Sequence, residues 1–509
     1  MPKWLNDAIF YEIYPQSFYD SNDDGIGDIN GIIAKLDYVR GLGCNAIWLN
    51  PVYDSPFMDA GYDVRDYYKV APRYGTNEDL VQLFKEAHAK GIRVLLDLVP
   101  GHTSDTHPWF LQAKKAAENE YSNRYIFTKT VWDAPPEYRM MCGICERDGN
   151  YMVNYFSSQP ALNYGFYEVT HPEWQLPHDH PDCLKTAGAI KDIMRFWLAK
   201  GADGFRVDMA DSLVKNDDEK IATAKIWRGV REMLDKEYPE AAMVSEWCHP
   251  DRAINNAGFH MDFYLDHYGN GYSRLFRYGD WGDRAAFNPN GRGSLEEFAV
   301  EYLPAYNRTK DKGYISFMTN NHDMPRVTAY LDRQAIKLVN AFIFTMPGVP
   351  FLYYGDEIGM RYQKDLVSKE GGYSRTGSRT PMQWNSGKNL GFSQSDDTYL
   401  PVDKSADAPT VENQSGDPDS IYRVVTDLIA LRHKYADLHG NGELEFTFRE
   451  GQLPFAFRRG GMVMYFNPTG KPAELEAVGS GDVVYKIGEA ILDGSKVKME
   501  AQSFLLVES

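Results

Sequence analysis

The feature that most limits the fold of this chain is a regular alternation of short apolar runs with amphipathic segments of helical period. In the segment 28–42, for example, Ile32, Leu36 and Val39 are spaced for one face of a helix. Such alternation is typical of parallel strands joined by crossover helices, and eight repeats make a closed (β/α)8 barrel. The runs expected to form strands are residues 9–14, 46–50, 94–99, 204–208, 243–246, 260–265, 315–319 and 351–354. The sequence therefore predicts an α/β fold built on a TIM barrel.

Two departures from this repeat indicate additional domains. About eighty residues separate the third predicted strand from the next helix, far more than an ordinary connection contains. After the last predicted helix the pattern changes to short alternating strands. We therefore expect a barrel at residues 1–104 and 175–438, an inserted domain after strand 3 at residues 105–174, and a C-terminal antiparallel β-sandwich at residues 439–509.

The charge and hydropathy of the chain exclude several classes of partner. A formal net charge of −18 disfavours nucleic acid and anionic membranes, because phosphate recognition needs a basic face. No apolar run reaches the roughly 20 residues that cross a bilayer, and the first residues contain no signal-peptide core. We therefore expect a cytoplasmic protein, or the trimmed form of a secreted one, that binds neither nucleic acid nor membrane. The sequence gives no signal of an oligomeric state.

Polar residues gather where the predicted strands end. The carboxyl ends of barrel strands meet at one rim, so polar groups there from independent strands are expected to form one site. Such groups follow or end four of the eight predicted strands: Asp97 and His102 at the third, Arg206 and Asp208 at the fourth, Glu246 at the fifth, and residues 320–323 at the seventh.

Paired carboxylates without a cluster of metal ligands are typical of glycoside hydrolysis, in which one acid protonates the leaving oxygen and another attacks or activates water. In the stretch GFRVDMADS, period-two geometry puts Arg206 and Asp208 on one face of a strand. They are either a structural ion pair or an arginine beside a reacting carboxylate. We expect Arg206 to keep Asp208 ionised for nucleophilic attack, and the apolar Trp247 to raise the pKa of Glu246 for acid catalysis.

The same residues fall within motifs of a known family. DLVPGH at residues 97–102, GFRVDMADS at 204–212, SEW at 245–247 and NNHD at 320–323 resemble four motifs of the α-amylase superfamily, the family 13 glycoside hydrolases. QPALN at residues 159–163 is similar to the fifth, which lies in the inserted domain. The likeness extends over nearly the whole chain. GVPFLYYGDEIG and RTPMQW look most like the oligo-1,6-glucosidase branch.

This resemblance implies a retaining double displacement through a covalent glucosyl-aspartate intermediate. Asp208 would be the nucleophile, Glu246 the acid/base, and Asp323 the group that holds substrate hydroxyls as the sugar distorts. Arg206 would orient Asp208. The other substrate-binding residues that the resemblance implies are Tyr62 and Asp63 at the terminal glucose, His102 and His322 at the cleaved sugar, and Arg326 at the side of the pocket.

An acidic loop near the start is a candidate cation site. In YDSNDDGIGD, residues 19–28, acidic and amide side chains recur at every second position, as in the first half of an EF-hand. The twelfth position is Gly31 rather than Glu, which excludes an EF-hand. We expect a structural calcium, with magnesium or a solvated acidic turn that caps the next helix as alternatives. No organic cofactor is expected. The ligands would be Asp20, Asn22, Asp24, the carbonyl of Ile26, and Asp28.

Departures from the family pattern leave the substrate open. Gly101 stands where the first motif normally has Asn, and Met209 follows the nucleophile where linkage-specific members carry Val or a smaller residue. The Lys-His pair that many endo-acting amylases place after the nucleophile is absent. We expect an exo-acting α-glucosidase on short oligosaccharides. Alternatives are an endo-acting amylase or neopullulanase, a transglycosylase or isomerase, and a non-enzymatic carbohydrate-binding member, which would lack the three carboxylates.

Overall fold

An eight-stranded sheet forms the centre of the molecule, and all its neighbouring strands are parallel. The computed structural model describes residues 1–265, 271–277, 279, 282–447 and 453–509. Each of the eight strands predicted from the sequence is confirmed. They are β1 (Phe10–Ile13), β2 (Ala46–Leu49), β5 (Arg93–Leu98), β8 (Gly204–Val207), β9 (Ala242–Ser245), β10 (Met261–Phe263), β11 (Tyr314–Ser316) and β12 (Phe351–Tyr353).

The sheet closes into a barrel. Its strand order is β11-β10-β9-β8-β5-β2-β1-β12, so the chain winds around the sheet and leaves β11 and β12 as its two ends. These ends meet where the Phe351 N–H donates to the Phe317 carbonyl at 2.9 Å, beside a parallel bridge from Met318 to Phe351. The TIM-barrel fold class is thereby confirmed.

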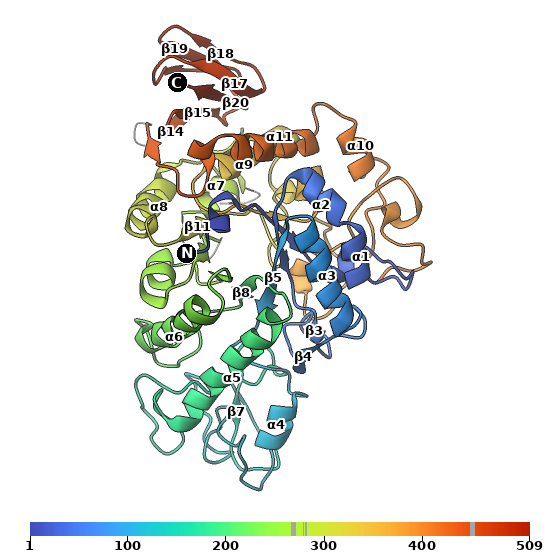
Figure 1. Ribbon diagram of the computed structural model, residues 1–509, viewed down its shortest axis with the longest axis vertical. Coiled ribbons are helices and arrows are strands. Elements are labelled where there is room, and N and C mark those ends of the chain that lie inside the picture. The colour runs from blue at the N-terminus through green and yellow to red at the C-terminus, as the bar shows by residue number, and fades with distance from the viewer. Residues whose placement is uncertain (266–270, 278, 280–281, 448–452) are drawn as a thin grey trace.

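Helices pack on the outside of the barrel (Figure 1). The single helix expected at residues 28–42 is instead broken at Lys35, which has φ −108° and ψ 7°. Within the described residues, no helix is both long and apolar enough to cross a membrane. The main helices are α1 (Ile29–Ala34), α2 (Leu36–Leu42), α3 (Asn77–Ala89), α5 (Pro181–Leu198), α6 (Ile221–Glu237), α8 (Glu296–Thr309), α9 (Arg333–Thr345) and α11 (Ile421–Lys434).

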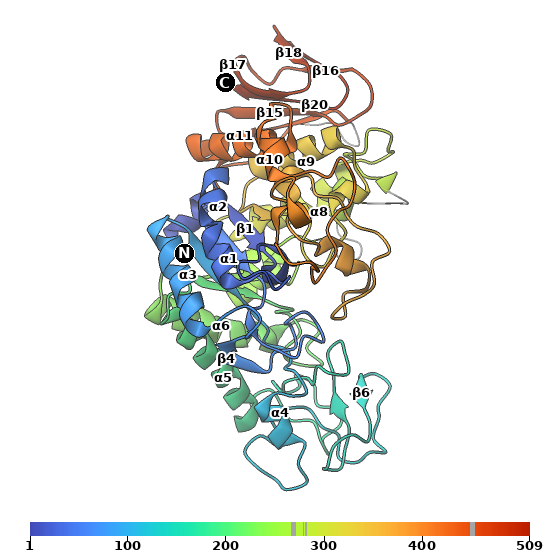
Figure 2. The same cartoon turned by 90° about the vertical axis from the view of Figure 1, so that its right-hand side faces the viewer.

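The long connection between β5 and α5 extends away from the barrel at one end of the molecule (Figures 1 and 2). It contains α4 (Pro108–Ala113), β6 (Met140–Met141) and β7 (Tyr151–Met152), with the rest in turns and loops. It has a small apolar cluster of its own, formed by Ile126, Met152, Ala161 and Phe166. The exact boundaries 105–174 stay a prediction.

Two antiparallel sheets occupy the opposite end of the molecule (Figure 2). The larger has the order β13-β14-β15-β20-β17 and the smaller the order β16-β19-β18. Side chains from both sheets share one apolar cluster, which includes Val463, Leu505 and Val497. The strands are β13 (Glu445–Phe446), β14 (Phe455–Arg459), β15 (Met462–Asn467), β16 (Ala473–Glu476), β17 (Asp482–Ile487), β18 (Ala490–Asp493), β19 (Lys496–Met499) and β20 (Ser503–Glu508).

Two buried arginines meet at the end of α9, where these sheets join the barrel. Arg432 of α11 donates to the carbonyls of Phe344 and Met346 at 2.7 and 2.9 Å, where α9 ends. Arg459 of β14 donates to the Thr345 carbonyl at 2.6 Å. Burial lowers the pKa of Arg432 to about 9 and that of Arg459 to about 10. The last carbonyls of α9, which have no partner within the helix, therefore receive their hydrogen bonds from both sides of the junction.

Candidate active site

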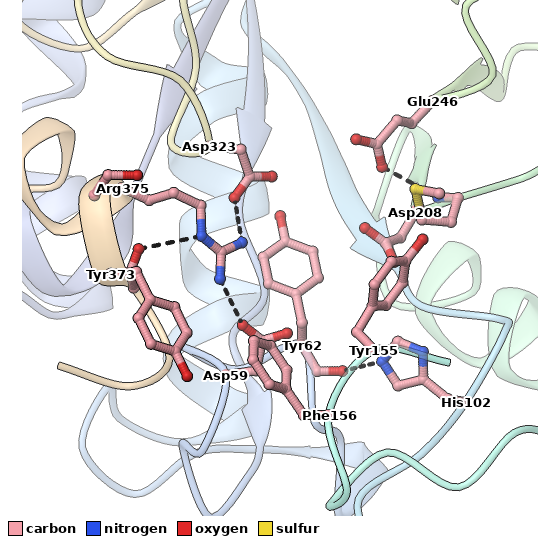
Figure 3. A pocket seen from close by; sticks show the side chains of 13 residues that line it. Asp59, Tyr62, His102, Tyr155, Phe156, Asp208, Glu246, Asp323, Tyr373 and Arg375 are labelled. Carbon is pink, nitrogen blue, oxygen red and sulfur yellow. Dashed lines mark hydrogen bonds and ion pairs between the residues drawn. The ribbon is translucent and has the colours of Figure 1, made fainter. Parts of the chain in front are cut away.

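A cavity of about 600 Å³ opens at the rim where the barrel strands end (Figure 3). It brings together side chains from the ends of β5, β8 and β9, from the loop after β11, and from three loops distant in sequence. Its lining residues are Asp59, Tyr62, His102, Tyr155, Phe156, Asp208, Met209, Glu246, Asp323, Gly372, Tyr373, Ser374 and Arg375.

Arg206 connects three carboxylates at the base of this cavity. Its side chain is fully buried, and its Nη1 atom lies 2.8 Å from Asp208 and 3.0 Å from Asp97. Its Nη2 atom lies 2.7 Å from Glu246. Asp97 also accepts hydrogen bonds from Trp48 and Tyr62, which fix it below the cavity. We call Arg206, Asp97, Asp208 and Glu246 the Arg206 cluster.

One cation does not neutralise three buried carboxylates, and the pKa values reflect this. Burial raises the pKa of Asp208 to about 6, against the opposing effect of Arg206. Burial also raises the pKa of Glu246, again opposed by Arg206. The expected influence of Arg206 on Asp208 is present, but burial outweighs it. Asp208 is therefore mostly ionised at neutral pH, close to the range in which it titrates.

The backbone after β8 supports the second carboxylate. Met209 has φ +41°, in the left-handed region that non-glycine residues rarely adopt. In this conformation its N–H donates to Glu246 Oε2 at 3.1 Å. The residue that follows Asp208 in sequence thus holds Glu246 beside it, and the strained turn couples the positions of both carboxylates.

Asp323 has the opposite surroundings, because three cations meet one carboxylate. His322 Nε2 lies 3.1 Å from Asp323 Oδ2, while Arg375 and Arg379 donate to Oδ1 at 2.8 and 2.9 Å. Burial by itself raises the pKa of Asp323, but His322 and the two arginines outweigh it and hold that pKa well below its usual range. We call Asp323, His322, Arg375 and Arg379 the Asp323 cluster.

Arg375 also closes one side of the cavity through Asp59, a residue that the sequence analysis missed. Its Nη2 atom lies 3.3 Å from Asp59 Oδ1, while Gln159 of the inserted segment donates to Asp59 Oδ2 at 2.7 Å. Figure 3 shows Arg375 between Asp59 and Asp323. A weak signal exists: Asp59 lies four residues before Asp63, and Arg375 four before Arg379. The sequence alone cannot choose between the members of either pair.

His102 lines the cavity as a neutral ring. Its Nε2 lies 3.0 Å from the Tyr62 carbonyl, which can only accept, so this nitrogen carries the proton. Its Nδ1 then accepts from the Asn154 amide at 3.1 Å. Burial lowers the pKa of His102 to about 4. A Cβ at Gly101 would lie 2.8 Å from that amide, so the departure from the family motif makes room for Asn154.

Two predicted substrate-binding residues do not reach the cavity wall. Asp63 is fully buried and accepts N–H bonds from Met58 and Asp59 at 2.8 and 3.0 Å, so it shapes the loop that carries Asp59. Arg326 is also fully buried and donates to Asp356 at 2.7 Å. Asp63 and Arg326 thus lie behind the residues that line the cavity and bond to other parts of the protein.

Of the other predicted site residues, some line the cavity and some lie buried behind it. Tyr62, His102, Asp208, Glu246 and Asp323 are exposed to the cavity. Arg206 and His322 are fully buried and act on the cavity through the carboxylates they contact.

Three aromatic side chains that the sequence did not single out also line the cavity. Tyr155 and Phe156 come from the inserted segment, and Tyr373 from the loop after β12. The rings of Phe156 and Tyr373 are nearly parallel, with centroids 6.4 Å apart and planes inclined by 20°. Aromatic faces of this kind offer apolar contact to a flat ligand.

Hydrogen bonds from within the acidic loop and from Ser393 hold its carboxylates. Asp20 accepts from the N–H of Gly25 at 2.7 Å and from the Ser393 hydroxyl at 2.6 Å. Asp28 caps α1 by accepting from the Gly31 N–H at 2.7 Å, as the alternative of a capping turn requires. Among the residues that the structure describes, no three His, Cys, Asp or Glu side chains converge as metal ligands. Calcium binding by residues 20–28 stays a prediction.

Comparison with known proteins agrees with this geometry. Residues 12–440 match the family described as Alpha amylase, catalytic domain. The chain therefore belongs to the α-amylase family of glycoside hydrolases, as the sequence motifs indicated.

The similar proteins include enzymes named for two kinds of activity, glucosidases and a trehalose synthase/amylase. The oligo-1,6-glucosidase of Heyndrickxia coagulans is 32% identical, with 87% of this chain and 88% of that protein covered. The glucan 1,6-alpha-glucosidase of Streptococcus pneumoniae is 31% identical, with 84% of each covered. The trehalose synthase/amylase of Mycolicibacterium smegmatis is 32% identical, with 88% of this chain and 78% of that protein covered.

A solved structure of an isomaltulose synthase variant from Erwinia rhapontici superimposes with a TM-score of 0.82. It is 25% identical and covers 100% of this chain and 99% of its own. A trehalulose synthase structure at 23% identity, covering 99% of this chain and 100% of its own, has a TM-score of 0.81 and shows the shared fold.

Proposed function

We propose that this protein is a retaining, exo-acting α-glucosidase that releases glucose from the non-reducing end of short α-gluco-oligosaccharides. The observation that carries the proposal is the pairing of Asp208 and Glu246 on one guanidinium at the base of a cavity closed on one side. A shared cation places the two carboxylates close together, as in retaining enzymes, whose carboxyl groups lie about 5–5.5 Å apart.

The roles follow from the surroundings of each carboxylate. Asp208, paired with Arg206, attacks the anomeric carbon as the glycosidic bond breaks. Glu246, whose raised pKa favours the protonated form, gives its proton to the leaving oxygen and afterwards takes one from the attacking water. Asp323, held ionised by three cations, accepts hydrogen bonds from sugar hydroxyls. Neutral His102 and the ring of Tyr62 complete the wall around the sugar.

The closed side of the cavity supports exo action. Arg375 bridges Asp59 and Asp323, so a ring of charged groups stands where a longer chain would continue. These groups can hold the hydroxyls of a terminal glucose and leave little room for a further residue. The similarity to an oligo-1,6-glucosidase and a glucan 1,6-alpha-glucosidase favours α-1,6 bonds as one class of substrate.

A timed product profile tests the proposal. Maltose, isomaltose, sucrose, maltoheptaose and amylose are supplied separately, and the anomeric configuration of the product is followed by NMR. Single α-glucose units from short substrates are expected. Mixed oligosaccharides from amylose would instead make the protein an endo-acting amylase. Rearranged disaccharides would make it a transglycosylase, an outcome to which the similarity with a trehalose synthase/amylase gives weight.

A further inference from the structure

Behind Asp323 lies a buried carboxylate that the mechanism above does not use. Glu12 is on β1, points into the barrel and is fully buried, and it does not line the cavity. Its Oε1 atom lies 2.9 Å from His322 Nδ1. Since the other ring nitrogen of His322 contacts Asp323 at 3.1 Å, one imidazole stands between two carboxylates.

At Nδ1 of His322 the Glu12 carboxylate, at 2.9 Å, is nearer than the Asn50 amide, at 3.2 Å, so the geometry favours a cationic ring. A neutral imidazole has one N–H and can donate to only one of two flanking carboxylates, whereas the imidazolium donates to both. The rings of Tyr62 and Tyr14 lie nearly parallel to the His322 ring, at centroid distances of 5.2 and 6.3 Å. Aromatic faces attract cations, so this stacking also favours the imidazolium form. Burial lowers the pKa of His322, but Asp323 and Glu12 outweigh it and raise that pKa to about 9.

Other charged and titratable groups near the ring come from several elements. Asp97 and Arg206, of the Arg206 cluster, act on the same buried region with opposite signs. Arg379 donates to the His322 carbonyl at 2.8 Å. The titratable and charged groups around His322 and Glu12 are Asp97, Asp323, Arg206, Arg379, Tyr14 and Tyr62.

We propose that Glu12 is a positioning residue, which through His322 holds Asp323 in place on the cavity wall and keeps it paired with a cation while the sugar binds. The inference rests on the proposed glucosidase function but concerns a residue that never touches substrate. If Glu12 is removed, His322 keeps one carboxylate partner. The ring then loses its second proton at lower pH, and Asp323 loses one of its three cations.

The test replaces Glu12 with Gln, which keeps the shape of the side chain and removes its charge. The measurement is kcat/KM on α-glucosyl fluoride between pH 6 and 10. Fluoride leaves without protonation, so deprotonation of Glu246 does not hide the behaviour of His322. At pH 6.5 the two enzymes should differ by less than about threefold. The alkaline fall of the Glu12→Gln profile should begin at least about one pH unit before that of the wild type.

A purely structural role for Glu12 predicts a different result. The Glu12→Gln profile would then be lower by one factor at every pH, parallel to the wild type, and that outcome would overturn the proposal. The matched control is Glu357→Gln, which changes another fully buried glutamate, bonded to Tyr11 and Tyr38, outside the cavity. Its pH profile should follow the wild type.

An NMR titration of 15N-labelled histidines tests the protonation of His322 without relying on enzymatic activity. The His322 ring signals are identified by their loss in His322→Asn. In the wild type both ring nitrogens should stay protonated to about pH 9. A ring that is neutral at pH 7.5 would reject the proposal, whether or not Glu12→Gln folds. A protein that fails to hydrolyse α-glucosyl fluoride at any pH would instead refute the proposed function and leave the titration as the test.

Discussion

The two sides of the cavity use charge in opposite ways. In the Arg206 cluster one cation serves three carboxylates, whereas in the Asp323 cluster three cations surround one. Burial acts in the same direction on Asp208 and on Asp323, since it raises the pKa of both, so it does not explain why their pKa values move in opposite directions. The ratio of charges leaves Asp208 with a pKa near 6 and holds that of Asp323 far lower.

This difference separates two tasks that carboxylates perform in one reaction. A group that exchanges protons works best with a pKa near the working pH, which the raised pKa of Glu246 favours, whereas the nucleophile must be ionised at that pH. A group that only accepts hydrogen bonds from sugar hydroxyls needs a fixed charge. The fold achieves both through the number of cations it places beside each carboxylate.

The strongest way to break the first cluster is Asp208→Asn. Without a nucleophile the glycosyl-enzyme cannot form, and kcat should fall by roughly three to six orders of magnitude. Turnover is measured on isomaltose and maltose, with folding checked by the melting temperature. Asp235→Asn, a change at an exposed ion pair with Arg231 outside the cavity, is the matched control. Near-wild-type turnover in Asp208→Asn would contradict the role of Asp208.

The loss of activity in Glu246→Gln should depend on the leaving group of the substrate. A loss of about 10²–10⁴-fold is expected on disaccharides, whose leaving oxygen needs a proton. The loss in the first step should be far smaller on an activated aryl glucoside. Single-turnover kinetics on both substrates provide the comparison within one variant. Equal losses on the two would argue against Glu246 as the acid.

Arg375→Ala attacks the second cluster and the wall of the cavity together. Charge-assisted hydrogen bonds are worth about 1.5–3 kcal/mol, so KM for short substrates should rise by roughly ten- to a hundredfold. The effect on kcat should be smaller, because His322 and Arg379 still hold Asp323. Arg361→Ala, which removes a comparable pair with Asp407 outside the cavity, should leave KM unchanged. A rise in KM for both variants would show that the effect is not local.

The contrast in pKa predicts the acid side of the pH profile. Below pH 6 Asp208 takes up a proton and cannot attack, so kcat/KM should fall about tenfold per pH unit there. Asp323 stays ionised across the same range and contributes nothing to this limb. The profile is recorded on isomaltose, with recovery of activity after return to pH 7 as the check on stability. An acid limb near pH 4 would mean that Arg206 outweighs burial.

The smallest expected effect concerns the acidic loop, which lies apart from both clusters. If residues 20–28 bind calcium, a chelator should lower the melting temperature by a few degrees and leave kcat nearly unchanged, because a bound cation stabilises only the folded state. Added calcium should restore the melting temperature. An unchanged melting curve, together with no metal by elemental analysis, would reject calcium and leave a hydrogen-bonded acidic turn.

The fold and the Arg206 cluster were predictable because their signals are local. Each strand is a short apolar run, four of the eight have the polar site residues at or just after their ends, and the barrel brings these ends together. Asp97, Arg206, Asp208 and Glu246 belong to three neighbouring strands, so the strand order alone makes them adjacent.

The closed side of the cavity was not predictable in this way. Asp59 and Arg375 are separated by more than three hundred positions and lie in loops whose conformation depends on tertiary contacts. The sequence suggested Asp63 as a sugar-binding residue, but its carboxylate accepts hydrogen bonds from backbone N–H groups of its own loop. The break at Lys35 also had no signal in the helical period of residues 28–42.

The buried arginines at the end of α9 bear on how the chain can be divided. The match to the family's catalytic domain ends at residue 440, but Arg459 lies beyond it and donates to the Thr345 carbonyl at the end of α9. A protein cut at residue 440 would lose this donor and would expose apolar side chains that the sheets now cover, such as Phe342, which packs against Phe455. The C-terminal sheets therefore complete the packing around α9, and recombination that replaced them would have to supply an equivalent donor.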